Sequence, residues 1–209
     1  LARLSGPQLA HMLLPVGGCT KDEVRALASR FGLPAADRPE SQDACFAGTR
    51  EGFAEELRRH YDAPARPGAI VDGTGRVLGR HEGLHRFTVG QRRGLGVALG
   101  ARAWVKALDP VTSRVTIATD PDALLSDTLT ASGMTWAGVS GPDPGRVEVQ
   151  IRARHRPAPA RVIRHADGCA TVRFDQPQRA VTPGQAVVVY AGDRVLGCGW
   201  IETGGRHDG

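Results

Sequence analysis

Cys45 is the side chain in this sequence with the clearest potential for chemistry. It follows a polar stretch, residues 37–43, and precedes Thr49, which is suited to cap a helix carrying Phe53 and Leu57. A helix N-terminus lowers the pKa of a nearby thiol and so raises the share of nucleophilic thiolate. Cys45 is therefore a candidate reactive thiol on a loop. The alternative is a small buried residue, which is the common fate of a free cysteine.

The remaining cysteines and the seven histidines show no pattern of metal ligands. Cys19 lies in a Gly-Gly-Cys-Thr loop, whereas Cys169 and Cys198 fall within alternating strands, where we expect them to be packed. Because no Cys-x-x-Cys or His-paired spacing occurs, the sequence predicts no metal site. The low cysteine density also argues against a disulfide scaffold and favours a reducing cytoplasm.

Residues 90–96, Gly-Gln-Arg-Arg-Gly-Leu-Gly, form a glycine-rich stretch that contains two adjacent cations, Arg92 and Arg93. The stretch lacks the Lys-Ser/Thr of a P-loop, and no helical pattern follows it. We therefore expect a turn with two solvated arginines, able to touch a phosphate backbone, and not a nucleoside triphosphate site.

Arg152, Arg154 and Arg156 alternate with other residues along an expected strand that begins at Arg146. A period of two would place the three side chains on one face, where like charges repel one another unless solvent or a polyanion neutralises them. The stripe is thus either a polyanion-binding surface or an exposed face of a barrel.

The elements that position these residues begin with helices. In residues 1–62, Ser5 and Thr20 each open a capping box, and Gly32 ends the second helical pattern. The apolar positions of the first pattern are Leu9, Met12 and Leu13, and those of the second are Val24, Leu27, Ala28 and Phe31. They are too few to form a core, so we expect this segment to be the trailing edge of a preceding domain and the chain to be part of a longer protein.

From Pro64 onward the apolar pattern changes to a period of two, which is typical of strands. The first set of runs covers residues 69–71, 76–78, 84–89, 103–108 and 114–118. The second set covers residues 128–136, 146–154, 161–165, 170–174, 185–190 and 195–202, with hairpin turns at Asp167-Gly168 and Gly192-Asp193. The second set predicts a small closed barrel.

The predicted fold class is therefore α+β and mostly β. We expect a short helical segment at residues 1–63, a small central β domain at 64–124, and a six-stranded antiparallel β-barrel at 125–205.

Positive charge is concentrated in two arginine-rich stretches. The 209 residues include 27 Lys and Arg and 22 Asp and Glu, a net charge of +5. Residues 76–114 carry eight basic and two acidic side chains, and residues 145–179 carry eight and three. Such clusters are typical of a polyanion partner, but also of a solvated surface in an arginine-biased chain. No apolar run is long enough to cross a bilayer, so we expect no membrane association.

Taken in order, these motifs resemble the C-terminal part of the bacterial tRNA-specific 2-thiouridylases, which place sulfur on the wobble uridine of certain tRNAs. The resemblance covers nearly the whole chain and rests on six stretches: residues 14–17, 40–48, 88–96, 152–156, 180–185 and 196–201. It implies an enzyme in which an N-terminal PP-loop domain uses ATP to adenylate O2 of the uridine. A cysteine persulfide then delivers sulfur, and AMP leaves.

The resemblance also implies roles for individual residues. Cys45 falls on the persulfide-carrying cysteine, which a sulfur-donor protein would load. Arg154, His155 and Gln185 fall where the family's barrel contacts tRNA, at the anticodon stem-loop and body. Adding the cations chosen above, the expected tRNA-binding residues are Arg154, His155, Gln185, Arg152, Arg156, Arg92 and Arg93. The expected protein is a cytoplasmic monomer.

This sequence departs from the family pattern in ways that limit the activity expected of this chain. The Ser-Gly-Gly-x-Asp-Ser signature of the PP-loop, the other catalytic cysteine and the acidic base are absent from it, so we expect this chain alone to bind no ATP and to be inactive. Ala44, His155 and Cys198 replace residues that are usual in the family. The alternative is a non-catalytic RNA-binding adaptor, in which the barrel binds tRNA and Cys45 is inert.

Overall fold

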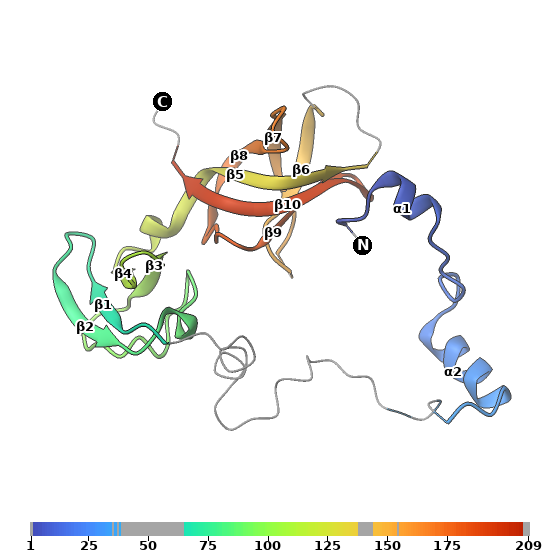
Figure 1. Ribbon diagram of the computed structural model, residues 1–209, viewed down its shortest axis with the longest axis horizontal. Coiled ribbons are helices and arrows are strands. Elements are labelled where there is room, and N and C mark those ends of the chain that lie inside the picture. Colours follow the sequence, from blue (N-terminus) through green and yellow to red (C-terminus); the bar gives the residue numbers. More distant parts are fainter. Residues whose placement is uncertain are drawn as a thin grey trace. The chain divides into compact units, whose positions relative to one another are not determined.

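The computed structural model describes residues 2–34, 36, 38, 65–137, 144–153 and 155–206 (Figure 1). The backbone forms two units, one of residues 7–62 and one that joins residues 1–6 to residues 63–209. The described part is mostly β with few helices, as the sequence predicts. None of its helices combines the length and the apolarity that a membrane crossing requires.

Two helices, α1 (Gly6–Ala10) and α2 (Lys21–Arg30), form the described helical segment. The Thr20 capping box of α2 is confirmed: the Thr20 hydroxyl accepts from the amide of Glu23 at 3.4 Å, and the Glu23 carboxylate accepts from the amide of Thr20 at 2.7 Å. The same hydrogen bonds lower the pKa of Glu23. Gly32 ends α2 with a φ of 63°, which allows the amide of Leu33 to reach the carbonyl of Ala28 at 2.9 Å.

The expected face of Leu9, Met12 and Leu13 on the first helix is wrong. α1 ends at Ala10, and Leu13 is 85% exposed. Beyond the helix, Pro15 keeps Leu14 out of helical backbone, and the chain turns at residues 14–17. The further helix expected after Thr49 lies outside the described residues.

A four-stranded sheet forms the central part of the second unit, in the order β2-β1-β4-β3. β1 and β4 are parallel, and the other neighbours are antiparallel. Asp72 closes the β1–β2 turn, and its hydrogen bond from the Thr74 hydroxyl helps to lower its pKa to about 2. The strands are β1 (Gly68–Val71), β2 (Val77–His81), β3 (Trp104–Asp109) and β4 (Arg114–Ala118).

The run at residues 84–89 is not a strand, contrary to expectation. It begins with a 3₁₀ helix, η1 (Leu84–Arg86), after which Phe87 turns into the core of the sheet. The apolar residues of this run pack against the sheet instead of pairing within it. Leu95 and Ala103, farther along the same connection to β3, are also buried against Val105, Val115 and Ile117.

The predicted six-stranded antiparallel barrel is confirmed, with the closed order β10-β5-β8-β7-β6-β9 (Figure 1). A short 3₁₀ helix, η2 (Pro121–Leu124), leads into it. Alternate residues point inward, and those from β6 to β9 are mostly Val and Ala, including Val149, Ala160, Val162 and Val189. The strands are β5 (Leu125–Trp136), β6 (Arg146–Gln150), β7 (Ala158–Arg164), β8 (Ala170–Arg179), β9 (Ala186–Ala191) and β10 (Arg194–Gly205).

Two glycines of β10 allow large side chains to pack against the barrel core. A Cβ on Gly197 would lie 2.5 Å from the Trp136 ring, and one on Gly199 would lie 2.3 Å from the sulfur of Met134. Cys198 between them is only 2% exposed, so its predicted packing is confirmed, and burial raises the pKa of its thiol. Cys169 is only partly buried, because it lies in the turn before β8 and not within the strand.

Candidate nucleic-acid interface

Two connections between strands lie at the end of the barrel where the chain enters β5. We call this end of the barrel the loop end. The β6–β7 connection is residues 151–157, and the β8–β9 connection is residues 180–185. β6 and β9 are antiparallel neighbours with Gln150 opposite Val188, so β6 ends where β9 begins. The structure therefore brings the two connections that carry His155 and Gln185 to the same end of adjacent strands.

The expected stripe of arginines along one strand is wrong. β6 ends at Gln150, Ile151 is buried, and Arg152 and Arg156 are exposed on the connection. β7 begins pairing with β6 at Ala158, directly after Pro157, which has no amide hydrogen to donate to a ladder. Arg154 lies outside the described residues.

The β6–β7 connection is held by side chains of its flanking strands. The side-chain amide of Gln150 donates to the carbonyl of His155 at 2.8 Å, and the Tyr190 hydroxyl donates to the Gln150 side-chain oxygen at 3.1 Å. The amide of His155 also donates to the carbonyl of Arg152 at 3.3 Å, which closes a turn. The connection is thus positioned before any ligand arrives.

His155 is partly buried within this connection. Burial lowers the pKa of its imidazole, and the positive charge of Arg152 lowers it further. The ring is therefore neutral near pH 7, and it can accept as well as donate a hydrogen bond.

Gln185 is fixed by the backbone on both sides. The amide of Gly184 donates to the carbonyl of Ile201, and the amide of Ile201 donates to the carbonyl of Gln185, both at 2.8 Å. Within the described residues, three buried side-chain atoms have no hydrogen-bond partner: Nδ1 of His81, Nδ1 of His155 and Oε1 of Gln185. The fold therefore leaves hydrogen-bonding capacity unused in both loop-end residues that the sequence selects.

The glycine-rich stretch at residues 90–96 is an ordered turn next to the loop end. Gln91 accepts from the amide of Thr88 and donates to the carbonyl of Arg93, both at 2.9 Å. Gly90 has a φ of 86°, and a Cβ there would lie 3.0 Å from the Cβ of Ala180. Glycine at this position therefore lets the turn approach the β8–β9 connection closely. No helix follows the turn in the described residues 91–120, as expected.

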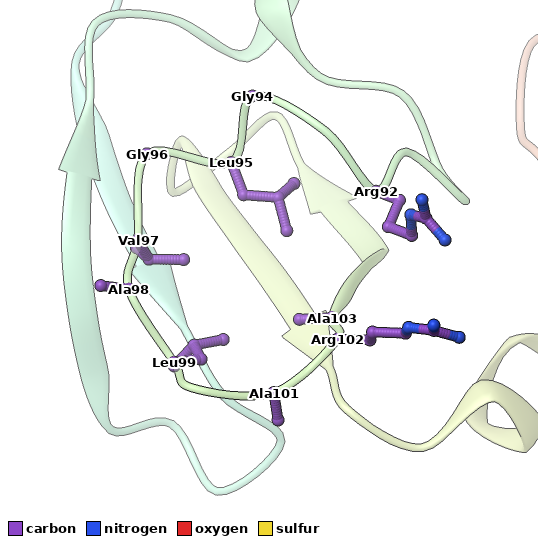
Figure 2. Close-up of a pocket in the computed structure, with 10 residues that line it drawn as sticks. All are labelled: Arg92, Gly94, Leu95, Gly96, Val97, Ala98, Leu99, Ala101, Arg102 and Ala103. Atoms are coloured by element: carbon purple, nitrogen blue, oxygen red, sulfur yellow. The ribbon is translucent and has the colours of Figure 1, made fainter.

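Arg92 lines an open hollow of about 650 Å³ together with Arg102, which is not among the residues expected from the sequence. Figure 2 shows both side chains extending toward the same side of the connection, while Leu95 and Val97 turn inward. Arg102 lies in the arginine-rich stretch of residues 76–114, but no motif surrounds it. Only charge density could have indicated it.

The acidic residues of that stretch do not neutralise this pair. Glu82 forms an ion pair with Arg86 at 3.1 Å, and Asp109 accepts hydrogen bonds from the β3–β4 turn. Arg92, Arg93 and Arg102 have no carboxylate partner in the described part of the chain, and all three are exposed. Such guanidinium groups suit phosphate oxygens, which they bind in a fork geometry.

Cys45, the candidate reactive thiol, lies outside the described residues, as do Glu40 and Ala44. Of the described cysteines, Cys19 is exposed. The described residues contain no cluster of three or more side chains that could ligate a metal ion.

Three family models match successive parts of the chain. Residues 1–49 match the tRNA methyl transferase HUP domain, residues 57–119 the tRNA methyl transferase PRC-barrel domain, and residues 126–201 the Aminomethyltransferase beta-barrel domain.

Curated relatives match almost the whole chain. The tRNA-specific 2-thiouridylase MnmA of Geotalea uraniireducens is 45% identical over 97% of this chain and 53% of its own length. The proteins of the same name from Moorella thermoacetica and Geobacter metallireducens are 46% and 44% identical, over 94% and 97% of this chain and 55% of each relative. The chain spans about half the length of the curated relatives it matches.

Proposed function

The chain belongs to the tRNA-specific 2-thiouridylase family, and on this premise we propose that it supplies the tRNA-binding surface and the sulfur-carrying thiol of a cytoplasmic enzyme that converts the wobble uridine of tRNA to 2-thiouridine. The observation that supports the tRNA-binding part most directly is the convergence at the loop end. Arg152, His155 and Gln185 lie there, and Gly90 brings the turn with Arg92 and Arg93 against Ala180.

The surface binds the sugar-phosphate backbone in this proposal. Guanidinium groups position RNA through its phosphates without reading bases. The neutral imidazole of His155 and the amide of Gln185 add hydrogen bonds of the kind that ribose hydroxyls accept and donate. The loop end therefore orients the RNA, and the reacting base lies elsewhere.

The sulfur chemistry is assigned to Cys45. A sulfur-donor protein would load this thiol as a persulfide, whose terminal sulfur is a soft nucleophile. That sulfur attacks C2 of the uridine after O2 has been adenylated, and AMP leaves with O2. A second thiol then attacks the sulfur of Cys45 and breaks the S–S bond. The second thiol and Cys45 are left as a disulfide, and the transferred sulfur remains on C2. The resemblance places that second thiol outside this sequence.

ATP does not fit the described residues. The turn at residues 90–96 has no Lys-Ser/Thr pair and no helix N-terminus after it, the two features with which a P-loop cradles a triphosphate. We therefore assign ATP to the half of the relatives that this chain does not span. ATP would supply only the adenylation of O2 that precedes attack by the Cys45 persulfide.

Replacement of Cys45 in the full-length protein tests the proposal. We expect Cys45→Ser to abolish 2-thiouridine formation, measured by mass spectrometry of digested tRNA, while tRNA affinity stays unchanged. The matched control is Cys19→Ser, which removes an exposed thiol and should keep full activity. Retained thiolation in Cys45→Ser would refute the sulfur-carrying role and leave only an RNA-binding module.

A further inference from the structure

Three arginines form a continuous row across the outer wall of the barrel. Arg146 on β6 lies directly opposite Arg161 on β7, and Arg161 lies directly opposite Arg173 on β8. All three side chains are exposed, because their neighbours along each strand, such as Val147, Val162 and Val172, point into the core. We call this row the arginine ladder. None of its members is among the tRNA-binding residues expected from the sequence.

The ladder is electrostatically unfavourable as it stands. Side chains directly opposite on neighbouring strands have Cβ atoms only about 4.5–5.5 Å apart, and like charges at that spacing destabilise a sheet. Asp175 pairs with Arg146. Glu148 shares the outer face of β6 but makes no ion pair among the described residues, and neither do Arg161 and Arg173. Two adjacent guanidinium groups are therefore left for an external anion.

The position of the ladder indicates which anion this is. Arg146 is four residues from Gln150 at the loop end, a distance of about 13 Å along β6. On β7, Arg161 follows exposed Arg156 of the loop-end connection. Glu148 and Pro159 form the outward-facing pair between the ladder and the loop end, so the ladder is a separate positive site, about 13 Å from the loop end and within the length of one RNA helix. A protein carboxylate would satisfy a single arginine, whereas the two adjacent guanidinium groups of Arg161 and Arg173 suit the phosphate oxygens of an RNA backbone.

We propose that the arginine ladder is a second phosphate-binding site for the same RNA, in which Arg161 and Arg173 bind backbone phosphates beyond those held at the loop end. The inference rests on the proposed tRNA-binding function. It requires no base recognition, since neutralised phosphates release counterions whatever the sequence. The ladder contributes affinity and orientation and has no part in the chemistry.

The test is the salt dependence of tRNA binding by the full-length protein, measured by fluorescence anisotropy between 50 and 200 mM KCl. Over this range a protein with six to ten phosphate contacts loses about 10³–10⁵ in affinity. For Arg161→Gln/Arg173→Gln we expect the slope of log K against log[KCl] to become shallower by about 1.4–1.8, which is about 0.7–0.9 for each lost contact. Affinity should fall about tenfold or more. The melting temperature should not fall, because cross-strand repulsion is relieved.

Arg114→Gln is the matched control. It removes an exposed cation at the far end of the β3–β4 hairpin from the turn that carries Arg92, and it should leave the slope unchanged. A wild-type slope in Arg161→Gln/Arg173→Gln would overturn the ladder and leave the proposed function intact, whereas a wild-type protein that fails to bind tRNA would overturn both. Weaker retention on heparin with unchanged tRNA binding would assign the ladder to another polyanion and would also refute the proposal.

Discussion

His155 is the residue of the loop end whose charge depends on its surroundings. Burial lowers its pKa first, and the charge of Arg152 lowers it second. Arg152→Ala removes only the second cause, so we expect the pKa of His155 to rise but to stay below 6.5. An NMR titration of the imidazole carbon and proton signals measures this directly. The other histidine signals serve as the internal control, and an unchanged His155 midpoint would contradict the prediction.

The same shift gives the stability of the connection a pH dependence of defined sign. The folded pKa is below the ordinary value of 6.5, so in the interval between the two the unfolded chain binds more protons than the folded one. The contribution of His155 to stability is therefore fully present above pH 6.5 and is lost as the pH falls toward the folded pKa. Acidification should loosen the loop end before it affects the barrel core.

At the scale of elements, short stretches of consecutive residues were enough to predict many of the helices, turns and strands. Thr20 and Glu23 specify the start of α2, and Gly32 its end. The turn residues Asp167-Gly168 and Gly192-Asp193 specify two hairpins, and alternating Val and Ala specify the barrel. Each of these devices works through hydrogen bonds or backbone angles that the local sequence itself supplies.

The features that the sequence did not predict depend on partners far away in the chain. The alternation of apolar and polar residues alone predicted that β6 continues past Gln150. A strand also needs a neighbour to pair with, and β7 begins pairing only at Ala158. Tertiary packing places Arg92 and Arg102 on the lining of one hollow. It also sets the strand register that aligns Arg146 with Arg161. A sequence pattern shows which face a side chain takes, and not which strand lies opposite it.

The β6–β7 connection depends on the hydrogen bonds that Gln150 makes with Tyr190 and His155. Tyr190→Phe removes the first of these, so we expect a loss of about 1 kcal/mol of stability and faster amide exchange in residues 151–157. Combined with Gln150→Ala the losses should not add, because both residues act in one network. Hydrogen-exchange mass spectrometry measures the exchange.

Thr203→Val is the control for this measurement. It removes a hydrogen bond between Thr130 and Thr203 of 2.7 Å on the exposed face of the barrel, and it should leave exchange in residues 151–157 unchanged. Additive losses for Tyr190→Phe and Gln150→Ala would show that the two side chains act independently and that the connection is held in another way.

At the scale of the whole molecule, the two arginine-rich stretches are separated in sequence but serve one surface in our proposal. The sheet contributes Arg92 and Arg102, and the barrel contributes the loop end and the arginine ladder. Gly90 links the two, since it lies against Ala180. A net charge of only +5 thus conceals two concentrated positive regions, with the acidic residues of residues 76–114 engaged in turns and local pairs.

If both regions bind one RNA, removing positive charge from the sheet should reduce the salt dependence of tRNA binding, as removing it from the barrel does. For Arg92→Gln/Arg102→Gln in the full-length protein, we expect the slope of log K against log[KCl] for tRNA binding to become shallower by about 1.4–1.8. The two regions share no partner among the described residues, so their effects should add when combined with Arg161→Gln/Arg173→Gln. Arg114→Gln again serves as the control. A combined variant no weaker than either double variant would mean that the two surfaces bind RNA as alternatives, and the proposal that one RNA contacts both would have to be abandoned.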